Sequence, residues 1–298
     1  MARIETTLPE HPWKPCIHAM QELRGRRSPD SFHSAASGLN GRIMEERKRR
    51  QIELHRGLAG VYHRRYYTDS AAVVFSSYWN RTIVRFLPAG RRLRVVDCGT
   101  GIGFLAGAAA RLGHETFGFD LCMEMMQAAV PETCEQVRFC QCDGEFLPYR
   151  AHVFDVAISR GLLHHLENWQ GAVREIHRIL KPGGLFIFSE PAEGNSLIRR
   201  LRRIVYKSSA QFDDDDYGIT SEQIDSLLGT GGFEKVALEP FGFLAYVLAG
   251  FPDAIPVVTS LPRSRDIARG LVRLDRGLAR TPLLRRFSLH LLGCYRKI

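Results

Sequence analysis

The chain of 298 residues lacks a long uninterrupted run of apolar residues, and this limits the class of protein. Its most apolar stretch, residues 241–261, is broken by Pro252, Asp253 and Pro256. A membrane-spanning helix needs about 20 apolar residues, so none is expected. The first fifteen residues also have no continuous apolar core, so we expect no secretory leader. These absences favour a cytoplasmic protein.

Cysteine is sparse and poorly arranged for cross-linking or metal binding. The seven cysteines occur without a secretory context, which argues against a disulfide framework. Cys140 and Cys142 have no second Cys or His pair that would complete a zinc site. The acidic run 213–216 is more typical of a solvated loop than of a metal site. We therefore predict buried or free thiols in a reducing compartment and no metal centre.

What the chain does contain is an apolar segment, a glycine-rich turn and a second apolar segment in immediate succession. The first segment ends in Asp97, glycine then occupies Gly99, Gly101 and Gly103, and apolar residues resume at 104–110. Such glycines allow a sharp turn between a strand and a helix and let a ligand approach the backbone. The dinucleotide fingerprint has a different glycine spacing, and an acid beside the loop would repel a pyrophosphate. The pattern favours a cationic ligand, such as one bearing an ammonium or sulfonium group.

Further apolar segments alternate with helical patterns along the chain. Strands are predicted at 116–119, 137–140, 154–159 and 185–188, and helices at 104–110, 169–180 and 220–228. This alternation predicts a doubly wound, Rossmann-like α/β sheet. Asp120 ends the second strand and lies 23 positions after Asp97. An acid about 20 residues after such a loop binds ribose hydroxyls in folds of this kind.

Taken in order, these motifs resemble those of class I S-adenosylmethionine-dependent methyltransferases, in the broad small-molecule and lipid branch. The resemblance covers about residues 80–190. It is carried by Val-Val-Asp-Cys-Gly-Thr-Gly-Ile-Gly, Gly-Phe-Asp, Cys-Asp-Gly-Glu-Phe-Leu-Pro-Tyr, Phe-Asp-Val-Ala-Ile-Ser, Leu-His-His and Leu-Lys-Pro-Gly-Gly. It implies a seven-stranded sheet whose last strand, residues 287–297, runs antiparallel. It also implies S-adenosyl-L-methionine as cofactor and S-adenosyl-L-homocysteine as product.

The resemblance implies roles for the residues around the glycine loop. Asp97 and the loop would hold the amino-acid part of the cofactor, and Asp120 would hold the ribose diol. Leu121 and Met123 would lie beside the adenine. Cys122 stands where serine is common in the family. Because this departure removes no charge, it predicts altered affinity rather than lost binding.

Later motifs supply the remaining cofactor contacts that the resemblance implies. Asp143 would accept a hydrogen bond from the adenine amino group, with Gly144 and Glu145 adjoining. Gly144 stands where alanine is common, again without loss of charge. Ser159 and Arg160, at the end of the strand 154–159, would line the methionine side by backbone contacts.

Two adjacent histidines are the candidates for the reacting site. Methyl transfer from a sulfonium requires alignment and exclusion of water, and a hydroxyl or carbon acceptor also requires a base. His164 and His165 follow the fourth strand, where related small-molecule methyltransferases often place a working histidine. One of the two is expected to face the cleft, and a histidine that caps the turn is the structural alternative. Glu190, at the end of the strand 185–188, would orient the histidine or bind the acceptor.

The predicted reaction is O-methylation of a small-molecule or lipid-linked acceptor with a histidine as general base. C-methylation of a quinone-like ring is the alternative reaction. A nicotinamide-dependent oxidoreductase is a further alternative, opposed by Asp97 and by the glycine spacing. A non-catalytic cofactor-binding or RNA-associated module is the alternative from a different functional class.

Three segments surround the methyltransferase core. The tyrosines Tyr62, Tyr66 and Tyr67 in the second of them would face substrate or pack in the core. The segments are a poorly ordered arm at 1–40, a helical extension over the cleft at 41–90, and a substrate lid or insertion at about 192–286 within a methyltransferase domain of residues 91–298.

The formal net charge of +9 is concentrated in arginine clusters at 42–50, 199–203 and 263–286. Such clusters bind nucleic acid, anionic membranes or acidic substrates, or they form solvated helix faces. The amphipathic pattern of 196–207 favours peripheral contact with an anionic membrane surface. Nucleic acid is not expected, because the Asn/Asp-Pro-Pro-aromatic motif of base-amino methylation is absent after the fourth strand. The sequence indicates no oligomeric state.

Overall fold

The computed structural model describes residues 39–166, 168–193, 200, 218–252 and 255–298. The predicted arm at 1–40 falls almost wholly outside the described residues. So do the acidic run 213–216 and, except for residue 200, the basic segment 196–207. Within the described ranges, no helix is both long and apolar enough to cross a bilayer. The described residues also contain no group of three or more potential metal-ligating side chains.

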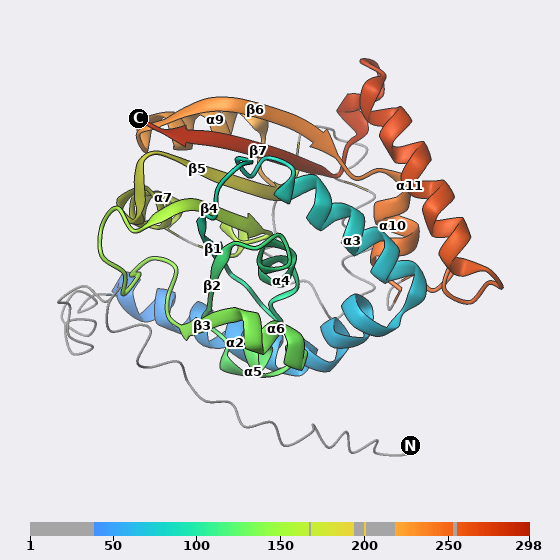
Figure 1. Cartoon of the computed structure of the whole chain (residues 1–298), viewed down its shortest axis with the longest axis horizontal. Helices are drawn as coiled ribbons and strands as arrows, with labels where there is room; N and C mark the ends of the chain where they lie inside the picture. The colour runs from blue at the N-terminus through green and yellow to red at the C-terminus, as the bar shows by residue number, and fades with distance from the viewer. Residues whose placement is uncertain (1–38, 167, 194–199, 201–217, 253–254) are drawn as a thin grey trace.

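A seven-stranded sheet in the order β3-β2-β1-β4-β5-β7-β6 forms the centre of the molecule (Figure 1). The strands β1 to β5 pair in parallel, and β7 pairs antiparallel with both β5 and β6. The predicted doubly wound sheet with an antiparallel last strand is thereby confirmed. The strands are β1 (Arg94–Cys98), β2 (Glu115–Asp120), β3 (Val137–Gln141), β4 (Phe154–Arg160), β5 (Leu180–Pro191), β6 (Phe233–Phe241) and β7 (His290–Lys297).

Two predicted boundaries change in the structure. The last strand begins at His290 rather than at residue 287, because Arg285–Phe287 form a 3-10 turn, η4. Strand β6, which the sequence pattern did not locate, lies inside the predicted insertion at 192–286. Most of its residues are exposed or half-buried, so it lacks the apolar signal of the inner strands. Between β6 and β7, the described residues of 242–289 lie outside the sheet and include α10 and α11.

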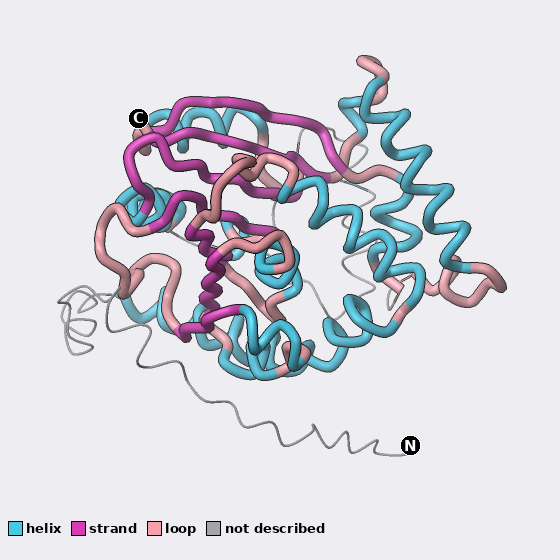
Figure 2. Tube along the Cα trace, in the orientation of Figure 1, coloured by secondary structure: helices cyan, strands magenta, loops and turns pink. Residues whose placement is uncertain are grey.

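Helices cover both faces of the sheet, as the traces in Figures 1 and 2 show. Successive strand residues point to opposite faces, so Val95 packs with α3, α4 and α10 whereas Val96 packs with α7 and α9. Helix α11 packs against α3 and α10 outside the sheet. The helices are α2 (Leu39–His63), α3 (Ser70–Val84), α4 (Phe104–Ala110), α5 (Met123–Gln127), α6 (Pro131–Gln136), α7 (Trp169–Ile179), α9 (Ser221–Thr230), α10 (Leu244–Gly250) and α11 (Ser264–Arg280).

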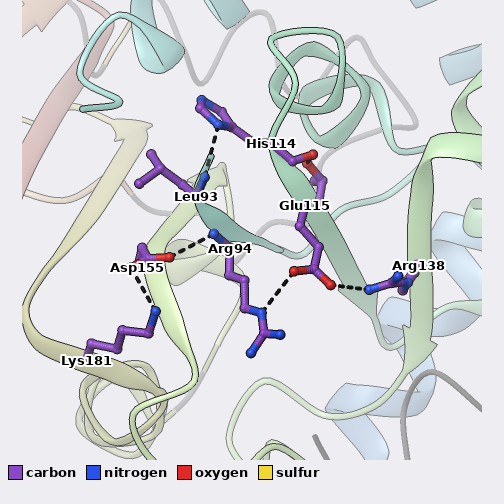
Figure 3. Close-up of polar contacts among 8 residues, drawn as sticks. Leu93, Arg94, His114, Glu115, Arg138, Asp155 and Lys181 are labelled. Carbon is purple, nitrogen blue, oxygen red and sulfur yellow. Dashed lines mark hydrogen bonds and ion pairs between the residues drawn. The ribbon is translucent and has the colours of Figure 1, made fainter. Parts of the chain in front are cut away.

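Charged side chains form a network of hydrogen bonds and ion pairs between neighbouring strands at the amino-terminal edge of the sheet (Figure 3). Asp155 accepts hydrogen bonds from the Arg94 backbone N–H at 2.8 Å and from Lys181 Nζ at 2.9 Å. Glu115 pairs with the side chains of Arg94 and Arg138. These contacts connect β1, β2, β3, β4 and β5 at one edge. The carboxyl-terminal edge, where ligands bind in such folds, is built differently.

Candidate active site

The glycine loop crosses the carboxyl edge directly after β1. Gly99, Gly101 and Gly103 have φ values of +68°, +53° and +71°, a region that favours glycine. Gly99 and Gly101 line a cavity, here called the loop cavity. Gly103 instead begins α4, and a Cβ there would lie 2.6 Å from the Phe139 ring. The structure therefore places two of the three predicted glycines at the cavity and gives the third a packing role.

Asp97 lies beneath this loop and is 1% exposed. Its Oδ2 accepts hydrogen bonds from Thr100 Oγ1 at 2.9 Å and from the Ala106 N–H at 3.0 Å. Burial raises the pKa of Asp97 to about 7, although these hydrogen bonds and the nearby Arg160 charge oppose the shift. The carboxyl group is therefore poised to ionise near neutral pH, and a cationic ligand would favour its charged form.

Asp120 stands at the end of β2 and lines the same cavity. Its two carboxylate oxygens accept the N–H groups of Gly101 at 2.8 Å and Cys122 at 2.9 Å. Each oxygen retains acceptor capacity toward a ligand. Of the two residues predicted beside the adenine, Leu121 lines the cavity, whereas Met123 packs with α4 in the adjoining core and Met125 lines the cavity instead.

A lysine that sequence reasoning missed lies across the far end of the loop cavity. Lys48 Nζ on α2 contacts Asp143 Oδ2 at 2.6 Å and Glu145 Oε2 at 3.1 Å. Burial lowers the pKa of Lys48, but the two carboxylates outweigh this and raise it overall. Burial raises the pKa of Glu145, whose Oε1 has no hydrogen-bond partner among the described residues. Gly144 lies between these acids at the cavity wall.

A second cavity, here called the aromatic chamber, adjoins the first. Gly99, Gly101, Arg160, Gly161 and His165 line both cavities. Helices α2, α3, α4 and α10 and the segments that follow α2 and α10 supply its rings. These rings are Tyr62, Tyr66, Trp79, Phe104, Tyr246 and Phe251. Of the predicted tyrosines, Tyr62 and Tyr66 therefore face the chamber, and Tyr67 does not line it.

His164 and Glu190 form a dyad at the chamber wall. His164 Nδ1 lies 2.7 Å from Glu190 Oε2, and the Glu190 carboxylate is fully buried. Glu190 Oε1 also accepts the N–H groups of Leu162 and Leu163, both at 2.9 Å. A carboxylate only accepts hydrogen bonds, so Nδ1 of His164 carries a proton and, in a neutral ring, Nε2 holds the free lone pair. Glu190 itself lines neither cavity, which makes it a positioning residue.

Both histidines face the chamber, whereas only one was expected to face the cleft. They lie in a 3-10 turn, η3 (Leu163–His165), and their ring centroids are 4.0 Å apart. His165 reaches the loop cavity as well and makes an edge contact with His55 on α2 at 5.5 Å. Only His164 has a ring nitrogen bound to Glu190, so Glu190 fixes the tautomer of His164 and not that of His165.

Arg160 occupies the junction of the two cavities. Its guanidinium donates to Asn80 Oδ1 at 2.8 Å and stacks over Tyr66 and Trp79 at 4.5 and 4.9 Å. Arg160 lines both cavities, and its guanidinium contacts rings of the chamber; the predicted backbone contact with the cofactor stays a prediction. Ser159, the neighbouring candidate, is fully buried in β4 and lines neither cavity.

A buried chain of hydrogen bonds supports the chamber from the other side. Trp79 Nε1 donates to Ser189 Oγ at 3.0 Å, and Ser189 Oγ lies 3.3 Å from His290 Nδ1. His290 Nε2 is 2.8 Å from Tyr246 Oη. Sequence reasoning missed this chain because its members come from α3, β5, β7 and α10. No local motif links them.

Comparison with known proteins places the glycine loop and the histidines in one matched segment. Residues 96–188 match a family model described as a methyltransferase domain. A ubiquinone/menaquinone biosynthesis C-methyltransferase from Syntrophotalea carbinolica is 35% identical over 133 residues, 42% of this chain and 55% of that protein. A malonyl-[acyl-carrier protein] O-methyltransferase from Erwinia pyrifoliae is 33% identical over 180 residues, 58% of this chain and 62% of that protein.

A solved structure extends the likeness beyond the matched segment. An S-adenosylmethionine-dependent methyltransferase from Thermotoga maritima superposes with a TM-score of 0.56 at 18% identity, covering 83% of this chain and 99% of that chain. At this identity the likeness shows the fold alone. The chain spans less than two thirds of the length of the two relatives named above. Lys48 and Glu190 lie outside the segment 96–188, so the family model does not describe them.

Proposed function

We propose that this chain is an S-adenosylmethionine-dependent methyltransferase that methylates an oxygen of a small-molecule acceptor, because residues 96–188 match a methyltransferase domain and the sheet has the strand order described above. The proposal assigns the loop cavity to the cofactor and the aromatic chamber to the acceptor. His164 serves as the general base. The observation that carries it is the contact of 2.7 Å between His164 Nδ1 and the buried Glu190 carboxylate at the chamber wall.

The cofactor would occupy the loop cavity and reach the adjoining edge of the chamber. Asp97, which lines the chamber beside Gly99 and Gly101 and has a raised pKa, would hold the ammonium group, and Asp120 in the loop cavity would accept from the ribose hydroxyls. Asp143 would accept from the adenine amino group beside Glu145, whose Oε1 is available as an acceptor. When bound there, the cofactor supplies a methyl group activated by its sulfonium.

The chain's own contribution to transfer is alignment, exclusion of water and removal of a proton. The chamber rings would enclose the acceptor, and His164 Nε2 would take the proton of its hydroxyl. Glu190 would hold the imidazole in the required tautomer and stabilise the imidazolium that forms. His165 lines both cavities and would lie beside both the cofactor and the acceptor.

C-methylation of a quinone-like ring is the second candidate. The relative from S. carbinolica is named for such a reaction, and the chamber's aromatic lining would accept a planar ring. The same dyad would then remove the proton of a ring hydroxyl, and carbon rather than oxygen would attack. The two reactions differ in product, because a C-methyl group forms in place of a methyl ether or ester.

Transfer of a labelled methyl group to hydroxylated aromatic acids, phenols and reduced quinones tests this proposal. We expect turnover with at least one class, a large loss in His164→Ala, and unchanged binding of S-adenosylhomocysteine in that variant. His114→Ala, at a half-buried position that lines neither cavity, is the matched control. Full turnover in His164→Ala would refute the general-base role. Cofactor binding without turnover on any acceptor would favour a binding module.

A second proposal is that helix α11, next to the chamber, contacts an anionic membrane. Five arginines lie along its exposed face, at Arg265, Arg269, Arg273, Arg276 and Arg280. Only one acid on that face is within ion-pairing distance, Asp266 with Arg269. Leu274 and Leu283 nearby are 47% and 73% exposed. Helix α10, which packs on α11, supplies Tyr246 to the chamber. This combination of positive charge and exposed apolar side chains fits the surface of an anionic membrane that delivers a lipid-linked acceptor.

Co-sedimentation with vesicles tests membrane contact. We expect binding to phosphatidylglycerol-containing vesicles, absence of binding to phosphatidylcholine alone, and loss in the triple variant Arg269→Gln, Arg273→Gln, Arg276→Gln. The triple variant Arg92→Gln, Arg111→Gln, Arg174→Gln removes the same charge from other exposed positions and serves as control. Equal loss in both would show that net charge, not α11, is responsible. Binding of RNA in preference to vesicles would contradict the assignment.

A further inference from the structure

Arg160 places a positive charge where the proposed cofactor is itself largely cationic. It lines both the loop cavity and the chamber. S-adenosylmethionine carries a sulfonium and an ammonium group, and only its carboxylate is anionic. Because like charges repel, an arginine beside the glycine loop would weaken cofactor binding unless its guanidinium met that carboxylate.

The sheet places the side chains of Asp97 and Arg160 on the same face. In the parallel pair of β1 with β4, Asp97 lies opposite Ile158. Arg160 follows Ile158 by two positions, so its side chain points to the same face as those of Ile158 and Asp97. The hydrogen bond between Arg160 and Asn80 shows that this is the face covered by α3. A carboxyl group and a guanidinium therefore stand on neighbouring strands beside the glycine loop.

Within the described part of the chain, Asp97 and Arg160 influence each other without forming an ion pair. The positive charge of Arg160 acts on Asp97, since it opposes the rise in the pKa of that carboxyl group. Hydrogen bonds join Asp97 to Thr100 and to the Ala106 N–H. The bond of the Arg160 guanidinium to Asn80 uses one of its several N–H donors. Each charged group therefore keeps hydrogen-bonding capacity for a ligand at this edge.

Neighbouring groups hold the Arg160 guanidinium in a fixed orientation. It lies over the rings of Tyr66 and Trp79, at 4.5 and 4.9 Å from their centroids. Asn80, which is 2% exposed, accepts from the guanidinium at 2.8 Å. The Asn80 amide is itself fixed, because its Nδ2 donates to the Phe104 carbonyl at 2.9 Å. An arginine that is already ordered loses little side-chain entropy on binding, so it contributes more to affinity than a mobile one.

We propose that the Arg160 guanidinium binds the carboxylate of the cofactor's amino-acid part while Asp97 binds its ammonium group. The inference rests on the proposed function for the assignment of the cofactor to this edge of the sheet. A guanidinium binds a planar carboxylate through charge-assisted hydrogen bonds, and the two charges of an amino acid then meet two opposite charges on one face. Arg160 thereby distinguishes the intact cofactor from a decarboxylated one.

Calorimetric titration with ligands that lack one charge tests this assignment without turnover. The probes are S-adenosylhomocysteine, its decarboxylated analogue, which keeps the amine, and its deaminated analogue, which keeps the carboxylate. Removal of the carboxylate should weaken binding to the native protein about tenfold or more, because a charge-assisted pair is lost. Arg160→Met should weaken binding of S-adenosylhomocysteine by a similar factor. The same variant should bind the decarboxylated analogue at least as tightly as the native protein does, because the repelling cation is gone.

Three variants serve as controls for this titration. Retained binding of the decarboxylated analogue by Arg160→Met excludes a folding defect as the cause of weaker S-adenosylhomocysteine binding. Arg160→Lys should keep part of the preference for the carboxylate. Asp97→Asn should lose affinity for the decarboxylated analogue and not for the deaminated one. Arg174→Met removes an exposed arginine on α7 that lines neither cavity and should leave all three affinities unchanged.

The possible failures give different results. The assignment is refuted if the native protein shows no preference for the carboxylate, or if that preference persists in Arg160→Met, as it would if Arg160 served the acceptor. Equal weakening of S-adenosylhomocysteine and its decarboxylated analogue in Arg160→Met also refutes it. In each of these cases binding of S-adenosylhomocysteine still supports the proposed cofactor. Absence of that binding in the folded native protein would refute the proposed function and this inference together.

Discussion

The two edges of the sheet use acidic side chains in opposite ways. At the amino edge, burial raises the pKa of Asp155, but bonds from the Arg94 N–H and Lys181 outweigh it and lower the pKa. Glu115 behaves alike between two arginines. At the carboxyl edge, burial dominates and raises the pKa of Asp97 to about 7.

This comparison distinguishes acids that stabilise the sheet from acids that we expect to bind a ligand. Acids at the amino edge are paired with cations supplied by neighbouring strands, and they connect those strands. At the carboxyl edge, Asp120 accepts from the loop backbone and Asp143 from one lysine, and burial raises the pKa of Asp97 and of Glu145. A cationic or hydrogen-bonding ligand would complete this second set. Substitutions at the two edges should therefore have separable effects on stability and on binding.

The largest effect is expected at Glu190, because this residue contributes to the stability of the fold and also positions His164. Glu190→Ala removes the acceptor of several backbone N–H groups and of His164, all in a fully buried place. The free energy of unfolding should fall by about 3–5 kcal/mol. Glu190→Gln should retain more stability, yet it should lower turnover strongly because an amide does not fix the histidine tautomer. Denaturant unfolding and single-turnover transfer measure the two effects; unchanged turnover in Glu190→Gln would contradict the dyad.

Asp97→Asn should affect binding of the cofactor more than stability. In the unliganded protein, a folded-state pKa of about 7 against an ordinary 3.8 means that stability from this group is lost as pH rises toward and through 7. The cofactor's ammonium needs the ionised form, so S-adenosylhomocysteine binding should strengthen as pH rises from 6 to 8. Asp97→Asn should weaken binding at pH 8 by about ten- to hundredfold.

Asp97→Asn should also remove the pH dependence of S-adenosylhomocysteine binding. Calorimetric titrations at pH 6, 7 and 8 measure it directly in both proteins. An equal pH dependence in Asp97→Asn would show that another group is responsible. Thermal unfolding over the same pH values provides the stability half of the test.

A smaller effect is expected at Lys48, which bridges Asp143 and Glu145. Lys48→Met leaves two neighbouring carboxylates without their shared cation, so the pKa of Glu145, already raised by burial, should rise further. Cofactor affinity should fall about three- to tenfold. Arg56→Met removes an exposed partner of Glu124 from the same helix and is the control. Unaltered affinity in Lys48→Met would show that this contact does not support the adenine end.

The smallest effect is expected at the amino edge. Glu115→Gln weakens the pairs with Arg94 and Arg138, whose side chains are 42% and 38% exposed. Solvent screening limits the loss of stability to about 0–1 kcal/mol. S-adenosylhomocysteine affinity should not change. A fall in affinity would contradict the claim that the amino edge contributes to stability and not to cofactor binding.

Much of the fold follows from local patterns in the sequence. Strand β1, the glycine turn and α4 come from contiguous residues whose periodicity is unambiguous. Thr220 was expected to begin a helix, and its side chain accepts the Gln223 N–H as a cap of α9. β6 escaped notice because an edge strand need not be apolar on both faces.

The candidate site is predictable only where one segment supplies it. Asp97, Asp120 and Asp143 end or follow predicted strands, so topology alone brings them to one edge of the sheet. Lys48 reaches the same edge from a helix before the first strand, and nothing in its local sequence reveals this. The chamber therefore had to be found in three dimensions, because its walls combine α2, α3, α10 and β7.

Calorimetric titration with S-adenosylhomocysteine, with NAD as the control ligand, tests the central claim most directly. The claim is that the carboxyl edge holds this cofactor at Asp97, Asp120 and Asp143. One-site binding of S-adenosylhomocysteine that is weakened in Asp97→Asn but not in Glu115→Gln, without binding of NAD, is the predicted result. Binding of NAD in its place, or no binding of S-adenosylhomocysteine by the folded protein, would contradict it.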